Sequence, residues 1–149
     1  IYCIIVFPRF YGFLWYFIHI CDKLFYIIFR LGGFNMPFIN SKISTALSEE
    51  QEKTLVSRLG QAVTLIPGKS ENWLMTGFEP EYHLYFRGEN STPAAFVEVK
   101  LFGSENKSAF AALTAEICNI YQEVLGIPSD HIYIKYQAVA NWGWNGSNL

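Results

Sequence analysis

The sequence predicts an α/β (α+β) fold in which duplicated β-α-β units form a four-stranded mixed sheet with two helices on one face. A strand, helix, strand order occurs twice after residue 36, with opening strands at Phe38 and Phe96. Similar segments follow the two helices, beginning at Lys69 and Pro128. Such crossovers are right-handed and join parallel strands, so both helices are expected on the same side of one sheet.

The first unit is predicted from one strand, one helix and a second strand. Phe38–Ile43 is the opening strand, Ser48–Thr64 the helix and Trp73–Gly77 the closing strand. Ser48 with Gln51 forms a capping box, and Pro67-Gly68 ends the helix. One apolar stripe on this helix contains Leu55, Val56, Leu59, Ala62 and Val63.

The second unit follows the same pattern. Ala94–Phe102 alternates small or aliphatic residues with larger or charged ones, the period of two that is typical of a strand whose faces differ. Ser104–Leu125 reads as a helix that Gly126 and Pro128 terminate, and Ile132-Tyr133-Ile134 lies in the fourth strand.

The helix-free face of the predicted sheet is the basis for an oligomer. A face carrying Phe and Ile residues is costly to leave in water, so either more chain covers it or copies of the protein pack together. We expect a homo-oligomer.

Residues 1–35 differ in composition from the remainder and contain twelve of the aromatic residues. Their apolar run Phe10–Cys21 stops at Asp22 and Lys23, too short to span a membrane alone. The segment is either upstream sequence translated in frame, since the first Met is Met36, or a signal or anchor. We therefore divide the chain into an extension, residues 1–35, and a folded domain, residues 36–149.

Charge and cysteine content exclude several functional classes for residues 36–149. The whole chain has 11 basic and 13 acidic residues, of which residues 1–35 contribute three and one, leaving eight and twelve. This mildly acidic domain has no basic cluster, so we expect no nucleic acid partner. Cysteines and histidines are too scattered for a disulfide framework or a metal site, so we expect no metal.

Several spaced motifs resemble the macrophage migration inhibitory factor family of the tautomerase superfamily, over nearly all of residues 36–149. They are Met36-Pro37-Phe38-Ile39, Gly68-Lys69, Val99-Lys100-Leu101-Phe102-Gly103, Ile132-Tyr133-Ile134 and Asn141-Trp142-Gly143-Trp144-Asn145. The resemblance implies a homotrimer of duplicated β-α-β subunits with active sites at subunit interfaces. It also implies a cofactor-free isomerase, a keto-enol tautomerase acting on small aromatic keto acids such as phenylpyruvate.

The resemblance implies that Pro37 is the catalytic base. A proline at a chain terminus carries a secondary amine, which accepts a proton when it is uncharged, whereas an internal proline has no such nitrogen. The base therefore requires Pro37 to be the mature N-terminus. Without the resemblance, the sequence indicates only that Pro37 is a proline at the beginning of a strand.

The substrate-binding residues are carried over from the same resemblance. Lys69 resembles the lysine that meets the substrate carboxylate, and the backbone N–H of Phe102 helps to hold that carboxylate. Tyr133, Trp144 and Trp73 resemble pocket aromatics; packing in a subunit interface is the other reading of these rings. Lys135 replaces an asparagine that bonds a ring hydroxyl in one family member, and Leu149 replaces the final pocket aromatic, so substrate preference is left open.

Two alternatives to the enzyme remain open from the sequence. One is a cytokine-like interaction protein with a protein receptor, in which catalysis is incidental. The other keeps residues 1–35 and makes a membrane-tethered domain, in which the Pro37 nitrogen is an amide. The resemblance implies a cytoplasmic protein, or one secreted without a signal peptide.

Overall fold

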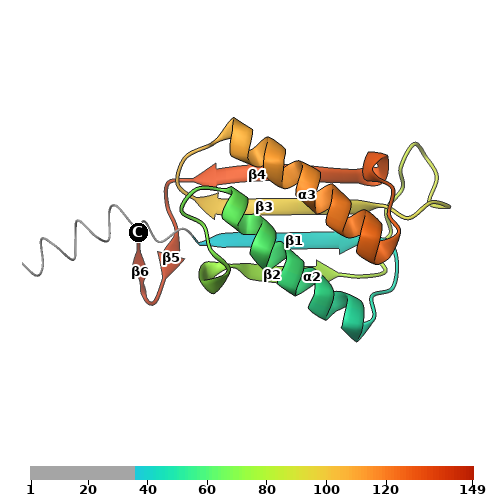
Figure 1. The fold of residues 1–149 in the computed structure, drawn as a ribbon, viewed down its shortest axis with the longest axis horizontal. Coiled ribbons are helices and arrows are strands. Elements are labelled where there is room, and N and C mark those ends of the chain that lie inside the picture. The colour runs from blue at the N-terminus through green and yellow to red at the C-terminus, as the bar shows by residue number, and fades with distance from the viewer. Residues whose placement is uncertain (1–35) are drawn as a thin grey trace, which may run out of the picture. The chain divides into compact units, whose positions relative to one another are not determined.

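The computed structural model describes residues 36–149, and the predictions for residues 1–35 lie outside the described residues. The two β-α-β units are β1 (Pro37–Ile43), α2 (Glu49–Ala62) and β2 (Met75–Glu79), then β3 (Ala95–Phe102), α3 (Lys107–Leu125) and β4 (Ile132–Val139). Short 3-10 segments at Val63–Leu65, Glu71–Trp73 and Ser129–His131 follow the helices, and a hairpin of β5 (Gly143–Trp144) and β6 (Ser147–Asn148) ends the chain. The duplicated unit predicted from the sequence is confirmed (Figure 1).

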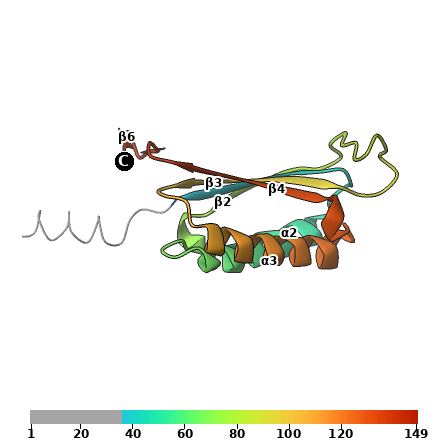
Figure 2. The same cartoon turned by 90° about the horizontal axis from the view of Figure 1, so that it is seen from above.

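The sheet is mixed, as predicted, with the strand order β2-β1-β3-β4. β1 pairs in parallel with β2, β3 pairs in parallel with β4, and the two units meet through the antiparallel pair β1 and β3. Both helices cover one face of this sheet (Figure 2). Within residues 36–149, no helix is both long enough and apolar enough to cross a membrane.

The core lies between the sheet and the two helices because the strands alternate strictly in burial. Ile39 and Ile43 of β1 point to the helices with Val97 and Val99 of β3, where the buried leucines and isoleucines of α2 and α3 meet them. The predicted apolar stripe of the first helix is wrong at one position, because Val56 is 41% exposed. Val56 lies beside the stripe on the helix surface, outside the layer between helix and sheet.

The helix-free face differs from the prediction in its aliphatic residues. Its aromatic members Phe38, Phe96 and Phe102 are half-buried, but the isoleucines of β1 face the helices instead. Charged side chains share this face: Glu98 lies 3.5 Å from Lys100 and 3.7 Å from Lys135. The face is therefore amphipathic rather than uniformly apolar.

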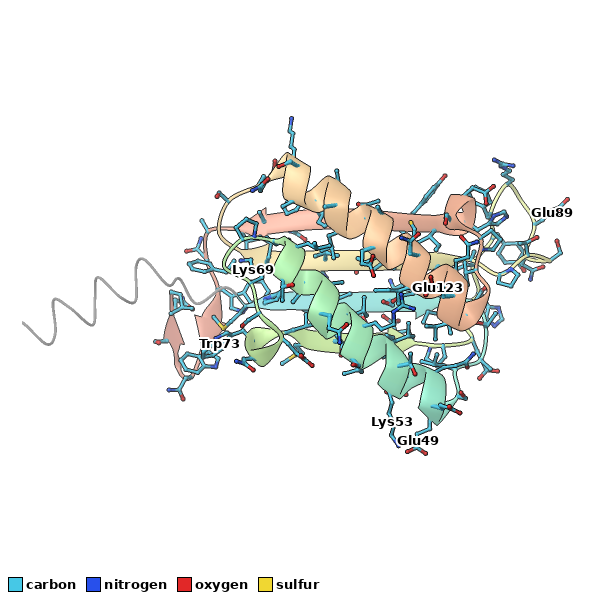
Figure 3. All side chains as sticks on the ribbon, viewed as in Figure 1. Glu49, Lys53, Lys69, Trp73, Glu89 and Glu123 are labelled. Carbon is cyan, nitrogen blue, oxygen red and sulfur yellow. The ribbon has the colours of Figure 1, made fainter. Side chains whose placement is uncertain are left out.

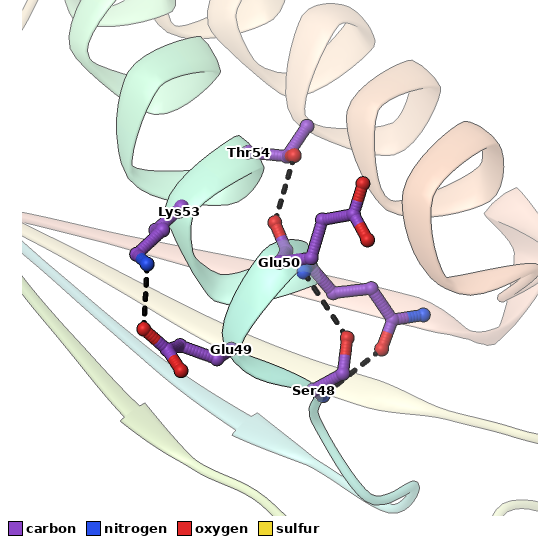
Figure 4. Close-up of polar contacts among 6 residues, drawn as sticks. Ser48, Glu49, Glu50, Lys53 and Thr54 are labelled. Atoms are coloured by element: carbon purple, nitrogen blue, oxygen red, sulfur yellow. Dashed lines mark hydrogen bonds and ion pairs between the residues drawn. The ribbon is translucent and has the colours of Figure 1, made fainter.

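Polar contacts fix where α2 begins. The Ser48 hydroxyl accepts a hydrogen bond from the Gln51 backbone N–H at 3.2 Å, and the Ser48 N–H donates to the Gln51 side chain at 3.0 Å (Figure 4). This is the predicted capping box. In the first turns, Lys53 pairs with Glu49 at 2.5 Å and the Thr54 hydroxyl donates to the Glu50 carbonyl at 2.8 Å (Figure 4).

α3 begins later than predicted because Asn106 caps it. The Asn106 side chain accepts from the Ala109 N–H at 3.1 Å, so the residues before Asn106 remain outside the helix. Gly126 ends the helix with a φ of 68°, a conformation that glycine adopts without a steric penalty. The predicted C-terminal boundary is thus confirmed.

Candidate active site

Four of the six predicted site residues lie on strands or segments that meet at one end of the sheet, where β1 and β2 begin. β1 and β2 begin at this end and β3 and β4 terminate there, since Phe38 pairs with Met75 and Pro37 pairs with Leu101. The hairpin β5–β6, which carries a fifth, follows β4 at the same end (Figure 1). The fold therefore brings together segments that are far apart in the sequence.

A pocket of about 490 Å³ opens at this end. Its volume is within the range of small-molecule sites. Apolar and aromatic residues dominate its lining, which comprises Met36, Pro37, Phe38, Asn72, Trp73, Leu74, Met75, Trp142, Gly143 and Trp144. Such a lining suits an aromatic ligand of one or two rings.

Pro37 lines this pocket as the first residue of the central strand β1. It is buried, and Met36 before it is also buried. β1 lies between β2 and β3, so Pro37 has a neighbouring strand on each side. A group at this position is held rigidly and is shielded from bulk water.

Lys69 is a buried cation at the same end of the molecule (Figure 3). Its side chain is carried by the turn Ile66-Pro67-Gly68, in which the Lys69 N–H donates to the Ile66 carbonyl at 3.0 Å. Lys69 is only 7% exposed, and its Nζ donates to the Phe102 carbonyl at 2.7 Å. Burial lowers the pKa of the Lys69 ammonium to about 8, because water no longer solvates the charge fully.

Phe102 ends β3 next to Leu101, the partner of Pro37. Its carbonyl is the acceptor for Lys69, a contact that sequence reasoning did not anticipate. Gly103 follows with a φ of 119°, a backbone conformation open to glycine, and its N–H donates to the Val139 carbonyl at 3.0 Å. Phe102 therefore links the Lys69 ammonium to the strand that borders Pro37.

Trp73 and Trp144 contact one another in the pocket wall. Their ring centroids are 5.3 Å apart and the ring planes cross at 83°, an edge-to-face geometry. They are 37% and 41% exposed. The pair joins the 3-10 segment before β2 to the C-terminal hairpin.

Tyr133 lies at the opposite end of the sheet. It is the second residue of β4 and pairs with Phe96, whereas Phe102 pairs with Val139 six residues further along. Six residues of extended strand span about 20 Å. Tyr133 is 60% exposed and contacts Phe86, with ring centroids 5.7 Å apart, so one chain does not bring Tyr133 to Pro37.

Seven lining residues were not predicted as site residues from the sequence: Met36, Phe38, Asn72, Leu74, Met75, Trp142 and Gly143. The pairing of Phe38 with Met75 follows from strand register, which the sequence pattern does not fix. Trp142 belongs to the motif Asn141-Trp142-Gly143-Trp144-Asn145, and its closeness to the predicted site residue Trp144 was the signal that could have identified it. No pattern in the sequence indicated Asn72.

These features define a duplicated β-α-β domain with an apolar pocket beside the first residue of a central strand and a buried lysine nearby. A family model described as macrophage migration inhibitory factor (MIF) matches residues 36–149. The chain belongs to the macrophage migration inhibitory factor family, a member of the tautomerase superfamily.

Individual relatives agree with this assignment. Macrophage migration inhibitory factor of Xenopus laevis is 32% identical over 102 residues, which is 64% of this chain and 84% of the relative. The crystal structure of Leishmania major MIF2 has 31% identity and a TM-score of 0.71, and covers 76% of this chain and 97% of its own. A homologue from Prochlorococcus marinus has 32% identity and a TM-score of 0.67, with 74% and 97% covered.

Proposed function

We propose that residues 36–149 form a cofactor-free keto-enol tautomerase that acts on phenylpyruvate-like α-keto acids, with the Pro37 amine as general base. The observation that carries the proposal is the position of Pro37, buried at the start of the central strand and lining an apolar pocket. Membership of the tautomerase superfamily supports this class of isomerase. The substrate and the base are our inference.

The base is functional only if Pro37 is the mature N-terminus. An α-amino group titrates near pH 8, and burial beside a cation disfavours its protonated form. We assign the role of that cation to Lys69, which is bonded to the strand that borders Pro37. A useful fraction of the amine is then uncharged at neutral pH and can accept a proton.

The reaction moves one proton from carbon to oxygen. Pro37 takes the proton from the carbon next to the ketone, the C–H electron pair becomes the C=C bond, and the carbonyl oxygen takes up the negative charge. The protonated amine then returns the proton to that oxygen, which gives the enol. The apolar lining excludes water, so solvent does not exchange protons with the enolate before the amine returns its proton.

Lys69 is proposed to hold the substrate carboxylate. An ammonium group has three N–H donors, and one of them is directed to the Phe102 carbonyl. A carboxylate that pairs with this ammonium would lie beside the end of β3. The role that the resemblance implies for the Phe102 backbone N–H stays a proposal, because the Lys69 contact is made through the Phe102 carbonyl.

Copies of the chain are proposed to complete the site as a homotrimer. Family membership supports self-association. Exposed Trp73, Met75 and Trp144 lie at one end of the sheet, and exposed Tyr82, Tyr85 and Tyr133 lie at the other end. Contact of one end with the opposite end of another copy is heterologous, and it closes into a ring when the rotation between copies is one third of a turn. Such a contact would place Tyr133 against the pocket of the neighbour.

The proposal is tested by comparing three forms of the protein in a phenylpyruvate tautomerisation assay. A chain beginning at Pro37 should be active, and the full chain, in which the Pro37 nitrogen is an amide, should be at least about 100-fold slower, the usual contribution of a general base. Pro37→Gly at the terminus replaces the secondary amine with a primary amine, and its rate should fall between those of the other two forms. Equal rates for the first two forms would remove Pro37 as the base.

A further inference from the structure

We propose that Gly60 and Glu71 are positioning residues for the pocket, because their contact holds Trp73 in the wall where an aryl ligand binds. This inference rests on the proposed function for its ligand class, the aryl keto acid. Gly60 lies in the interior of α2, where glycine is less favourable than alanine. A glycine at such a position needs a reason, and here the reason is the side chain that covers it.

The side chain of Glu71 occupies the space that a larger residue at position 60 would need. A Cβ atom added to Gly60 would lie 2.6 Å from Cδ, 2.8 Å from Cγ and 2.8 Å from Oε1 of Glu71. Carbon atoms in contact are normally about 3.5–4.0 Å apart, so this space is already filled. Because Cγ is among the atoms in conflict, a movement of the carboxylate alone would not relieve the clash. The whole Glu71 side chain, or the segment that carries it, would have to move.

The burial of Gly60 is explained by the same contact. The apolar stripe of α2 faces the sheet through residues such as Leu59, and Gly60 follows Leu59 at about 100° around the helix axis. Gly60 lies three residues after Ser57, which lines a hollow of about 340 Å³ together with Glu71. Glu71 therefore covers this flank of the helix, and Gly60 is buried although it lies beside the stripe.

The 3-10 turn that follows α2 transmits the position of Glu71 to Trp73. The Trp73 N–H donates to the Ser70 carbonyl at 3.2 Å, and the Leu74 N–H donates to the Glu71 carbonyl at 3.0 Å, so these residues form one ordered turn. Trp73 contacts Trp144 edge to face, with ring centroids 5.3 Å apart, and both rings line the pocket. A displaced Glu71 would therefore move the Trp73 ring relative to Trp144.

The test combines a spectroscopic and a binding measurement on the full chain. Near-UV circular dichroism reports the Trp73–Trp144 pair, whose signal is the difference between the wild type and Trp73→Ala. The quenching of tryptophan fluorescence by 3-phenylpropanoate reports the dissociation constant of this unreactive aryl acid. In Gly60→Ala we expect the pair signal to be lost and the affinity to fall about fivefold, as expected for one aromatic contact. The midpoint of urea denaturation should not fall, because alanine favours the helix.

Variants of Glu71 separate the shape of this side chain from its charge. Glu71→Gln keeps the shape and should leave both readouts as in the wild type. Glu71→Ala should reproduce the effects of Gly60→Ala, and the double variant should bind as well as either single variant, since both changes remove one contact. Because Glu71 is exposed, Glu71→Ala tests the contact even where Gly60→Ala does not fold. Gln61→Ala, an exposed change at the next residue of α2, is the matched control and should change neither readout.

The outcomes separate this inference from the proposed function. An unchanged pair signal or an unchanged affinity in Gly60→Ala and Glu71→Ala, additive effects of the two changes, or a lost signal in Glu71→Gln would overturn the positioning role. A wild type that does not bind 3-phenylpropanoate would contradict the ligand class of the proposed function, and the pair signal would still decide the positioning role. If signal and affinity both depend on Gly60 but a chain beginning at Pro37 does not tautomerise phenylpyruvate, the positioning role stands and the tautomerase proposal fails.

Discussion

The Nζ atom of Lys69 donates a hydrogen bond to the carbonyl oxygen of Phe102 at 2.7 Å. This contact orients a buried cation toward the strand that pairs with Pro37. Lys69 is one of two buried polar residues among residues 36–149, and a buried charge is retained only where it has partners. The contact therefore ties the geometry of the site to the end of β3.

The first prediction concerns the pH dependence of catalysis. The folded-state pKa of Lys69 is about 8, below its ordinary 10.5, so the ammonium is present below that pH and is lost as the pH rises through it. For a carboxylate substrate, kcat/KM should therefore fall above about pH 8 in the chain beginning at Pro37. Lys69→Arg keeps the charge at all these pH values and should remove the fall. If kcat/KM falls by the same factor in Lys69→Arg, the pH dependence comes from another group.

The second prediction concerns the two tryptophans of the pocket wall. Trp73→Ala and Trp144→Ala each remove one ring of the edge-to-face pair, so KM for phenylpyruvate should rise about tenfold, consistent with the loss of an aromatic contact worth about 1 kcal/mol and its buried area. The aliphatic substrate 2-oxobutanoate makes no ring contact and serves as the control. If KM rises equally for both substrates, the tryptophans support the fold rather than bind the ring.

The third prediction tests a site shared between copies. Pro37→Gly and Tyr133→Ala should each reduce activity, because the first removes the secondary amine and the second removes the ring supplied by a neighbour. Mixing equal amounts of the two variants during refolding should restore about a quarter of the sites, since a closed ring pairs one subunit's Pro37 with another's Tyr133. The tautomerisation rate of the refolded mixture measures the fraction of restored sites. A rate no higher than the mean of the separate variants would place Tyr133 outside the site.

The fourth prediction concerns stability. The hydroxyls of Ser41 and Tyr121 hydrogen-bond each other, and both side chains are fully buried between sheet and helix α3. Tyr121→Phe leaves the Ser41 hydroxyl without this partner, so the free energy of unfolding should fall by about 1–3 kcal/mol. Urea denaturation measures it.

Two further variants serve as controls for that pair. The double variant Ser41→Ala, Tyr121→Phe should be less destabilised than the sum of its single changes, since both polar groups are gone. Tyr136→Phe is the matched control, because the Tyr136 hydroxyl is only half-buried and contacts Thr114 and the Phe110 carbonyl. Additive single changes would show that the hydrogen bond does not couple the two residues.

Much of the fold follows from local signals in the sequence. Ser48 with Gln51 marks the start of α2, Gly126 the end of α3, and the alternation of Ala95–Phe102 a strand with two different faces. The predicted second strand began too early, because Glu71–Trp73 forms a 3-10 turn and β2 starts at Met75. The hairpin β5–β6 was not predicted, since two-residue strands leave no periodic pattern.

The site depends on tertiary relationships that local signals do not contain. Burial of Lys69 contradicts the usual exposure of lysine and results from the turn that places it beneath Phe102. The location of Tyr133 follows from the parallel register of β3 and β4, which places it far from Phe102 in the same chain. Asn72 lines the pocket only because the 3-10 segment precedes β2 at the end of the sheet where β1 begins. The roles proposed for Lys69 and Tyr133 stay predictions.

The intact mass and N-terminal sequence of the protein from its natural source test the central claim most directly. We predict a chain that begins at Pro37, because only then does the buried first residue of β1 carry a secondary amine. A chain that retains residues before Pro37 would leave an amide at this position and would contradict the role of Pro37 as the base.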